Sequence, residues 1–452
     1  MSGFISFINI ITGIMFILAI RGLSSPQTAR QGNLIGIFGM IIAIITTLFS
    51  QQVNDKVYPL IITLFGGGVG IYIALKTKMT SLPQTIAIFN GLGGLSAVFI
   101  ALASIISGST SYLDNSIGII IGGIAFSGSM IAFAKLQGII SSQITKFNHQ
   151  HLLNLILTFC ILSLLFIFII SHNPIIFYIL GISTIILGIL LVLPIGGADM
   201  PVIISILNSY SGWAAVGIGF SLNNVLLIIV GSIVGASGSI LSYIMVKSMN
   251  RSLLNVITGG LSDFDRLQSN EAETKIAKPA NARDAAFIME NANKIIIVPG
   301  YGMAVAQAQY VLKEMAEILQ NKYHVEVKYA IHPVAGRMPG HMNVLLAEAN
   351  VPYEDVFTLD DINREFITTD VAYVIGANDI TNPLAKTDIS SPIYGMPVLD
   401  VEKSKTIFFV KRSLANGYSG IENPLFFAEN TLMLYGDAKQ ITEQIVTNLE
   451  ND

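Results

Sequence analysis

Residues Ile295–Val305 read IIIVPGYGMAV, and this stretch decides the fold of the C-terminal part of the chain. The apolar run Ile295–Val298 predicts a buried strand, and a Gly-x-Gly turn then leads into a helix. In a nucleotide-binding element the first glycine permits the tight turn, and the second lets backbone approach a pyrophosphate. The motif is short, but its position between strand and helix supports it. It predicts cofactor contacts at Gly300, Tyr301, Gly302, Met303, Ala304 and Val305.

The composition separates a membrane part from a soluble part. Only 12% of the 452 residues are charged, about half the fraction typical of soluble proteins. Most of these charges lie beyond Lys247. We therefore expect a polytopic α-helical membrane bundle at residues 1–250, a hinge or linker at 251–284, and an α/β Rossmann-like doubly wound domain at 285–452. The single cysteine, Cys160, excludes a disulfide within the chain.

Nine apolar segments have the length of about 20 residues that a membrane-spanning helix needs. They are 4–20, 34–50, 57–75, 84–107, 117–136, 152–171, 174–194, 200–220 and 224–246. The basic residues of the short loops fall almost entirely on one side of the predicted membrane. Because basic loops stay in the cytoplasm, this bias predicts an N-terminus outside and a cytoplasmic C-terminal domain.

No predicted span carries a charge deep inside it, although an ion path in a membrane protein usually has one. The spans carry Asn90, Asn208 and Asn224 instead. An amide does not titrate near neutral pH, so a proton path would use water, Asp199 at the cytoplasmic edge, or another subunit. The alternative is that these asparagines only hold helices together.

Strands and helices alternate in the C-terminal part, which predicts a parallel, doubly wound sheet. We expect strands at Lys294–Val298, Val325–Ile331, Val371–Ile375, Pro397–Leu399, Thr406–Val410 and Thr431–Tyr435. We expect helices at Met303–Gln320, Met342–Ala349 and from Asp437 to about Leu449. Ligands bind such sheets at the carboxyl ends of the strands.

Two observations favour NADP over NAD. An NAD site usually has an acid after the second strand to bind the ribose 2′-hydroxyl, but here that strand runs into His332 and Pro333. A 2′-phosphate needs fixed cations, and Lys411, Arg412 and Ser413 follow the strand Thr406–Val410 directly. The alternative for the basic pair is a solvated surface position.

Three other loops at the same edge of the sheet supply candidate residues. Arg337 lies among glycine and proline and suits a pyrophosphate clamp, and Asp379 follows a buried strand. Tyr418 between glycines suits a lid over the nucleotide. No carboxylate or cysteine cluster accompanies His332 or His341, so we predict no metal site. The candidates in these loops are Val334, Ala335, Gly336, Arg337, Met338, Pro339, Gly376, Ala377, Asn378, Asp379, Gly417 and Tyr418.

Long motifs across the chain resemble the proton-translocating NAD(P) transhydrogenase family, specifically its β subunit. The soluble part contributes GYGMAVAQAQY (300–310), HPVAGRMPGHMNVLLAEA (332–349), VIGANDITNP (374–383) and VKRSLANGYSGIENPLFF (410–427). The membrane part contributes GGADMPVIISILNSYSGWAA (196–215) and SGSILSYIMVKSMNRS (237–252).

The resemblance implies that this chain binds NADP(H), while a partner α subunit carries the NAD(H) domain and further membrane helices. Hydride would pass from NADH to NADP⁺ as a proton crosses the bacterial inner membrane inward, in a dimer of αβ units that supports NADPH production. The arginine matching Arg337 would hold the pyrophosphate, and Lys411, Arg412 and Ser413 the 2′-phosphate. Tyr418 would cover the cofactor, and Asp379 would link binding, protonation and docking. The family's partners are other subunits and the lipid bilayer, not nucleic acid.

The chain departs from some relatives at Asn90, where they have a membrane histidine. In other branches that histidine lies on the α component, so we expect the relay to use water near Asn90, Asn208, Ser237 and Asp199 with a partner histidine. The rival hypothesis is a channel or transporter gated by an NADP(H)-sensing domain. It predicts an ion filter or charged transport residues in the spans, and the sequence has neither.

Overall fold

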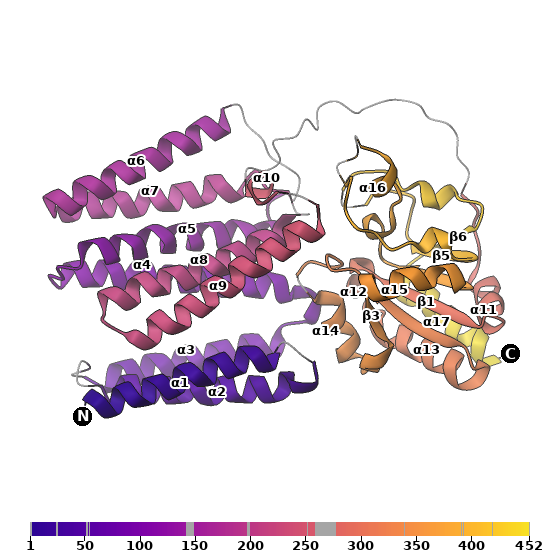
Figure 1. Cartoon of the computed structure of the whole chain (residues 1–452), viewed down its shortest axis with the longest axis horizontal. Coiled ribbons are helices and arrows are strands. Elements are labelled where there is room, and N and C mark those ends of the chain that lie inside the picture. Colours follow the sequence, from indigo (N-terminus) through magenta and orange to yellow (C-terminus); the bar gives the residue numbers. More distant parts are fainter. Residues whose placement is uncertain are drawn as a thin grey trace. The chain divides into compact units, whose positions relative to one another are not determined.

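The chain forms two compact units in a computed structural model (Figure 1). One unit comprises residues 1–195 and 203–242, and the other residues 196–202 and 243–452. The residues described are 2–23, 26–50, 53, 55–141, 149–196, 199–250, 252–257, 277–338, 340–389, 391, 393–417 and 419–451. Most of the predicted linker at 251–284, from residue 258 to 276, lies outside them.

The first part of the chain is a bundle of long apolar helices. Nine helices among the described residues are long and apolar enough to cross a membrane, which confirms the predicted bundle. They are α1 (Ser2–Leu23), α2 (Pro26–Leu48), α3 (Val57–Lys76), α4 (Leu82–Ile106), α5 (Tyr112–Leu136), α6 (Gln150–Ser171), α7 (Pro174–Val192), α8 (Met200–Ser221) and α9 (Val225–Ser248). A short helix, α10 (Leu253–Ile257), follows α9.

Glycines set the closest helix contacts in this bundle. A Cβ atom added at Gly94 of α4 would lie 2.6 Å from the carbonyl oxygen of Gly122 on α5, and one added at Gly122 would meet the Gly94 oxygen at 2.7 Å. On α8, a Cβ at Gly212 would lie 2.4 Å from the backbone nitrogen of Gly235 on α9. Small residues that let backbones touch are the usual means of helix packing in lipid.

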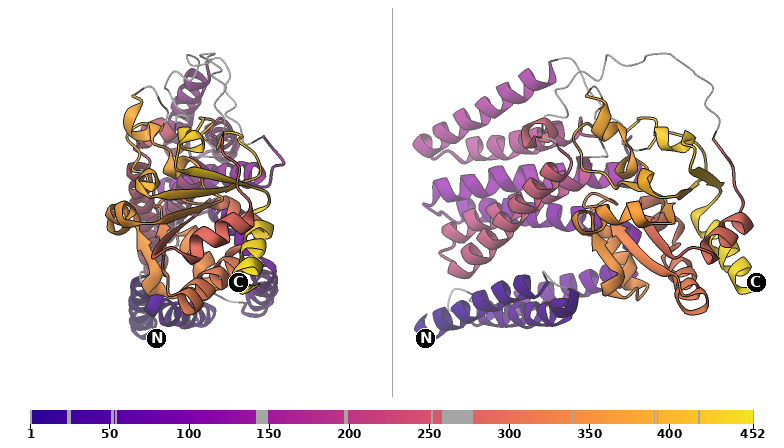
Figure 2. Two further views of the ribbon diagram at one scale, coloured as in Figure 1. Left: turned by 90° about the vertical axis from the view of Figure 1, so that its right-hand side faces the viewer. Right: turned by 45° about the vertical axis from the view of Figure 1, so that its right-hand side comes forward.

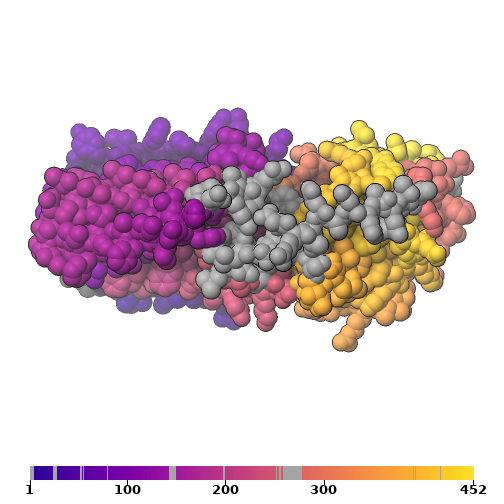
Figure 3. All heavy atoms as spheres, turned by 90° about the horizontal axis from the view of Figure 1, so that it is seen from above, coloured from indigo at the N-terminus to yellow at the C-terminus, as the bar shows by residue number. Residues whose placement is uncertain are grey.

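The glycines of α3 are different, because nothing in the described chain fills the space beside them. Added Cβ atoms at Gly66 and Gly70 meet no heavy atom within 4 Å, and no residue of α3 is buried. The small-residue spacing of α3 therefore makes no contact within the described chain. α6 lies on the face of the unit that Figure 3 shows. Its side chains Leu155, Phe159 and Phe166 are exposed, as expected of side chains that face lipid.

The second part of the chain is built on one parallel sheet with the order β3-β2-β1-β4-β5-β6, which confirms the predicted doubly wound fold (Figure 2). The strands are β1 (Lys294–Pro299), β2 (Glu326–Ile331), β3 (Val356–Thr358), β4 (Val371–Ile375), β5 (Thr406–Lys411) and β6 (Thr431–Tyr435). The helices are α11 (Ala282–Glu290), α12 (Tyr301–Ala306), α13 (Gln309–Tyr323), α14 (His341–Glu348), α15 (Leu359–Ile362), α16 (Leu384–Thr387) and α17 (Ala438–Asn451).

Two expectations for this unit are wrong. The helix expected at Met303–Gln320 is two helices, because Gln307 adopts a left-handed backbone (φ 54°) between α12 and α13. The strand expected at Pro397–Leu399 does not form, and the sheet instead contains β3, which the sequence analysis missed. β4 pairs directly with β5, so the sheet has no place for a strand between them.

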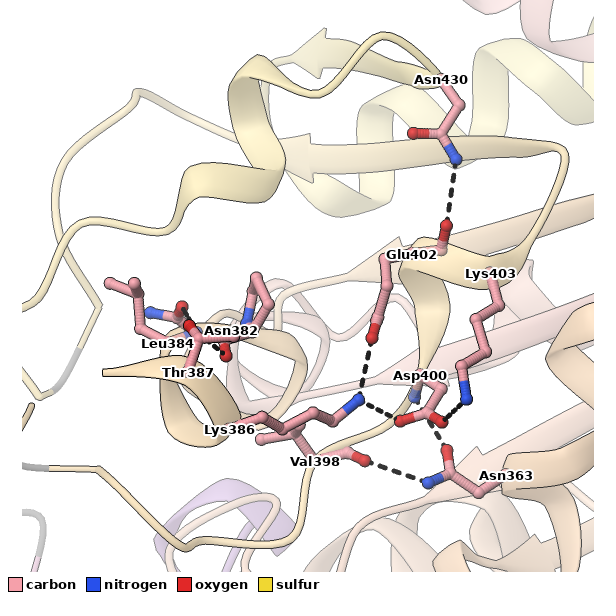
Figure 4. A network of polar contacts seen from close by, with 11 residues as sticks. Asn363, Asn382, Leu384, Lys386, Thr387, Val398, Asp400, Glu402, Lys403 and Asn430 are labelled. Atoms are coloured by element: carbon pink, nitrogen blue, oxygen red, sulfur yellow. Dashed lines mark hydrogen bonds and ion pairs between the residues drawn. The ribbon is translucent and has the colours of Figure 1, made fainter. Parts of the chain in front are cut away.

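Side chains replace strand pairing in the segment around Pro397–Leu399 (Figure 4). Asn363 donates to the Val398 carbonyl at 3.2 Å and accepts from the Asp400 backbone N–H at 2.8 Å. Lys386 of α16 forms ion pairs with Asp400 and, at 2.8 Å, with Glu402. The backbone is thus satisfied without a ladder, and the segment is tied to α16 as it crosses towards β5.

We predict that Gly94→Ala lowers the thermal stability of the purified chain, because the new methyl group overlaps backbone atoms of α5. The cost expected for overpacking is about 1–3 kcal/mol. Gly66→Ala is the matched control, since its methyl group meets nothing in the described chain. Melting curves in detergent measure both changes, and equal melting temperatures for the two variants would contradict the packing argument.

Candidate functional site

One pocket at the carboxyl edge of the sheet brings together loops that are far apart in the sequence. Within the α/β unit its walls come from the segments after β1, β2, β4, β5 and β6. The order β2-β1-β4 places the topological switch at β1, which is where open α/β sheets bind ligands.

The glycine turn after β1 is fixed by the loop after β4. A Cβ atom at Gly300 would lie 2.4 Å from the Gly376 carbonyl oxygen, and one at Gly302 would lie 2.6 Å from the Gly376 Cα. The N–H of Gly300 donates to Ile375, and that of Gly302 donates to Gly376, each at 2.9 Å. These two donors are therefore used inside the protein, so the glycines serve loop packing more directly than phosphate binding.

Arg337 brings a positive charge to the pocket on the loop after β2. Its guanidinium carbon lies 4.3 Å from the centre of the Tyr301 ring, a cation–π arrangement that joins the first two loops. Its backbone N–H donates to Nδ1 of the buried His341 at 3.1 Å. Burial, and then the charge of Arg337, lower the pKa of His341, which keeps the ring neutral and able to accept this bond.

Two further cations line the pocket after β5. Lys411 donates to the Ala415 carbonyl at 2.7 Å and lies 4.4 Å from the centre of the Phe426 ring. Burial lowers the pKa of Lys411, and the carboxylate of Asp379 partly opposes that shift. Arg412 is exposed and forms a 2.8 Å ion pair with Asp437, and this hydrogen bond lowers the pKa of Asp437.

Asp379 joins the loop after β4 to the loop after β5. Its carboxylate accepts hydrogen bonds from the backbone N–H of Ser419 at 2.9 Å and from the Ser419 hydroxyl at 2.7 Å. Beside it, the Nδ2 atom of Asn378 is buried and has no hydrogen-bond partner within the described part of the chain. Because Asn378 also lines the pocket, this amide is a donor that a bound ligand could satisfy.

Most of the predicted cofactor residues line this one pocket. Those on its wall are Gly300, Tyr301, Gly302, Val305, Val334, Ala335, Gly336, Arg337, Met338, Gly376, Ala377, Asn378, Asp379, Lys411, Arg412, Ser413 and Gly417. Met303 and Ala304 are fully buried instead and do not line it. Pro339 and Tyr418 lie outside the described residues.

We did not predict from the sequence the pocket wall that follows β6. Gly436 and Ala438 line the pocket at the start of α17, and Ser419 lines it beside Asp379. The position of Gly436 directly after a predicted strand was a usable signal, since carboxyl ends of parallel strands share one edge. Ile393 and Met396 also line it, but no sequence pattern marks them.

The residues predicted for a proton path do not form one cluster. Asn90 of α4 donates to the Ile204 carbonyl of α8 at 3.4 Å, and Ser211 of α8 donates to the Asn90 carbonyl at 2.9 Å. Asn208 is partly buried and shares this face of α8, one turn from Ile204. Ser237 is exposed on α9 and donates to its own helix at Val234, while Asp199 is buried just before α8.

His332 is a buried structural group with a fixed tautomer. Its Nε2 lies 2.6 Å from the Pro397 carbonyl and must donate, while Nδ1 accepts from the Val334 N–H at 3.2 Å. Burial lowers the pKa of His332 to about 4, although the Pro397 bond opposes the shift. No group of three histidine, cysteine or acidic residues among those described could hold a metal.

Together, the apolar helices and the parallel sheet define a polytopic membrane protein with a Rossmann-like α/β domain. Comparison with known proteins gives the family. The NAD(P) transhydrogenase beta subunit family matches residues 5–448. Two relatives named NAD(P) transhydrogenase subunit beta, from Rhodospirillum rubrum and one of its strains, are each 56% identical over 97% of this chain and 97% of their own length. The chain belongs to the family of NAD(P) transhydrogenase beta subunits.

We predict that the unfolding free energy falls as the pH drops from 6.5 to about 4, because the buried His332 must stay neutral in the fold. The unfolded chain binds the proton near pH 6.5 and the folded chain only near 4, so the loss across this window is roughly 3 kcal/mol. His332→Gln, which cannot titrate, should show a flatter pH dependence. Denaturant unfolding at several pH values tests this, and parallel curves for the two proteins would contradict it.

Proposed function

We propose that the pocket of the α/β unit binds NADP(H) and that the chain works as half of a proton-pumping transhydrogenase. The observation that carries the proposal is that Arg337, Lys411 and Arg412 line one pocket, at the carboxyl edge of a doubly wound sheet. NADP carries both a pyrophosphate and a 2′-phosphate, and these need separate cations.

The arrangement of the loops supports a separate role for each cation. Arg337 lies over the Tyr301 ring beside the glycine turn, and we propose that it holds the pyrophosphate. Lys411, Arg412 and Ser413 lie at the end of β5 or directly after it, and we propose that they hold the 2′-phosphate. β2 runs into His332 with no acid after it, which agrees with a 2′-phosphate in place of a free 2′-hydroxyl.

The remaining loops orient the nucleotide and exclude water. The unpaired amide of Asn378 offers a donor, and the Asp379–Ser419 hydrogen bonds hold the loop after β5 against the site. When bound, the nucleotide supplies the hydride chemistry, and the protein supplies its orientation. Tyr418 stays a predicted lid residue.

We describe one such pocket among the residues of the structure, and we propose that hydride transfer needs a second component. Its NADP⁺ would accept hydride from NADH held by a partner α subunit, once docking brings the two nicotinamides to about 3–3.5 Å. The name "subunit beta" of its relatives agrees with such a partner. We further propose a dimer of αβ units in the bacterial cytoplasmic membrane, with the N-terminus outside and the α/β domain in the cytoplasm.

Proton movement inward would be coupled to nucleotide binding, because each must depend on the same conformational states. We propose that water near Asn90, Asn208 and Asp199 carries the proton, together with a histidine from the partner. Ser237 is the weakest member of this group, since it is exposed on α9 and bonds only to its own helix.

We predict that Arg412→Ala weakens NADP⁺ binding by about 10–100-fold, the value of a charge-assisted hydrogen bond, and leaves NAD⁺ binding nearly unchanged. Titration calorimetry on the full chain measures both affinities. Lys439→Ala removes a nearby exposed cation that does not line the pocket and is the matched control. An equal loss of affinity for NADP⁺ and NAD⁺ would show that Arg412 does not bind the 2′-phosphate.

Reconstitution tests the function as a whole. Vesicles containing this chain and an α subunit should transfer hydride from NADH to an NADP⁺ analogue and acidify the compartment on the α/β side. Asn208→Leu should abolish proton-coupled turnover without changing NADP⁺ affinity. Full activity from this chain alone would contradict the proposal that a second subunit is needed. Unchanged proton pumping by Asn208→Leu would show that Asn208 is not part of the proton path.

A further inference from the structure

A buried histidine holds the backbone of the loop that carries Arg337. His341 is the first residue of α14 and is fully buried. Its Nδ1 atom accepts a hydrogen bond from the backbone N–H of Arg337 at 3.1 Å. The backbone N–H of His341 donates to the Met338 carbonyl at 3.2 Å, so the chain turns back on itself between Arg337 and His341. The imidazole therefore fixes the backbone of a residue four positions earlier in the chain.

Gly336 allows this loop to lie directly against the His341 ring. Its φ of 106° is in a region of backbone conformation that residues with side chains rarely adopt. A Cβ atom added at Gly336 would lie 2.6 Å from the Cβ atom of His341 and 2.9 Å from its Nδ1 atom. The position before Arg337 therefore needs a glycine for two reasons, the backbone angle and the closeness of the imidazole.

The same imidazole is adjacent to the aromatic ring on which the Arg337 charge lies. The ring centres of Tyr301 and His341 are 6.0 Å apart, and the rings meet edge to face at 62°. The guanidinium carbon of Arg337 lies 4.3 Å from the centre of the Tyr301 ring. His341 is thus linked to Arg337 twice, once through the backbone N–H and once through Tyr301.

Packing by itself does not account for a histidine at this position. Because Nδ1 accepts a hydrogen bond, the neutral ring carries its proton on Nε2. This Nε2 atom is buried and has no hydrogen-bond partner among the described residues. A buried donor without a partner lowers stability, and an apolar side chain would avoid that cost. What a histidine adds here is the Nδ1 acceptor, and burial, followed by the charge of Arg337, lowers the pKa of His341 and keeps this acceptor unprotonated.

We propose that His341 is a positioning residue for Arg337 and sets the place at which the guanidinium holds the pyrophosphate. This inference rests on the NADP(H) site proposed above. His341 is not among the residues that line the pocket, whereas Arg337 and Tyr301 line it, so His341 acts through them. Without the Nδ1 acceptor the loop after β2 would lose its anchor, and affinity for the pyrophosphate would fall. Binding of the 2′-phosphate by Lys411 and Arg412 would be retained.

The alternative is that His341 only packs α14 against the rest of the α/β unit. Its replacement would then lower stability and weaken every ligand of the pocket to a similar degree. The two alternatives therefore differ in which part of the nucleotide loses affinity.

The test compares NADP⁺ with 2′-AMP, which carries a 2′-phosphate but no pyrophosphate. In titration calorimetry on the full chain, His341→Leu should weaken NADP⁺ binding by at least about tenfold and leave 2′-AMP affinity within about twofold. Met342→Ala truncates the next residue of α14, which is equally buried, and is the matched control. It should lower the melting temperature without a selective loss of NADP⁺ affinity. An equal loss for both ligands in His341→Leu, or the same selective loss in Met342→Ala, would overturn the proposal.

Two amide variants test where the acceptor must lie, and they keep the test valid if His341→Leu does not fold. The side-chain oxygen of asparagine reaches the place of Nδ1, whereas that of glutamine reaches the place of Nε2. His341→Asn should therefore bind NADP⁺ nearly as tightly as the unmodified chain, and His341→Gln should bind it at least about tenfold more weakly. Equal affinities of the two variants for NADP⁺ would contradict a role of Nδ1.

A double-mutant cycle shows whether His341 acts through Arg337. Because Arg337→Ala already removes the charge, adding His341→Leu should change NADP⁺ affinity little further. Losses that add would show that the two residues act independently and would overturn the proposal. If the unmodified chain binds neither NADP⁺ nor 2′-AMP, the proposed function fails. If it binds both and His341→Leu binds both equally well, only the assignment of His341 fails.

Discussion

The contact between the turn after β1 and the loop after β4 is the constraint on which the pocket depends. Gly300 and Gly302 touch the backbone of Gly376 so closely that no side chain fits at either position. This contact aligns the two loops on either side of the topological switch, and their N–H groups are used to hold it. Asp379 extends from one of these two loops, and Arg337, on the loop after β2, contacts the other through the Tyr301 ring. The pocket is thus preorganised by backbone packing, while its charge comes from side chains.

In the membrane unit, close backbone contact and sparse polar bonding work together. Glycines bring α4 to α5 and α8 to α9, and polar side chains bond across the α8–α9 and α4–α8 contacts. Ser209 bonds to the Gly235 carbonyl of α9 at 2.6 Å, while Ser211 bonds to α4, so α8 is held from both sides. α8 is therefore linked to α4 and α9 by hydrogen bonds, without a charged side chain in these contacts.

Much of this architecture follows from local pattern. Apolar length predicts the helices, and alternation predicts the sheet, because both depend on burial that each segment shows by itself. The break at Gln307 and the absence of a strand at Pro397–Leu399 do not follow, because they depend on tertiary partners such as Asn363 and on direct pairing of β4 with β5. The hydrogen bonds of Asn115 on α5 with Ser104 of α4 and Ser221 of α8 do not follow either, because they form only when three helices bring these residues together.

The left-handed break at Gln307 has a consequence for how firmly an anion is held. α12 is only six residues long, so its aligned peptide dipoles are few, and it offers a weak electrostatic field at its N-terminus. In the proposed NADP(H) site, attraction for phosphate then depends on side chains of two separate loops, Arg337 after β2 and Lys411 with Arg412 at the end of β5. A small displacement of one loop would weaken phosphate binding of this kind, while the sheet stays in place. That would suit the proposed function, in which the site retains and releases a nucleotide in every cycle.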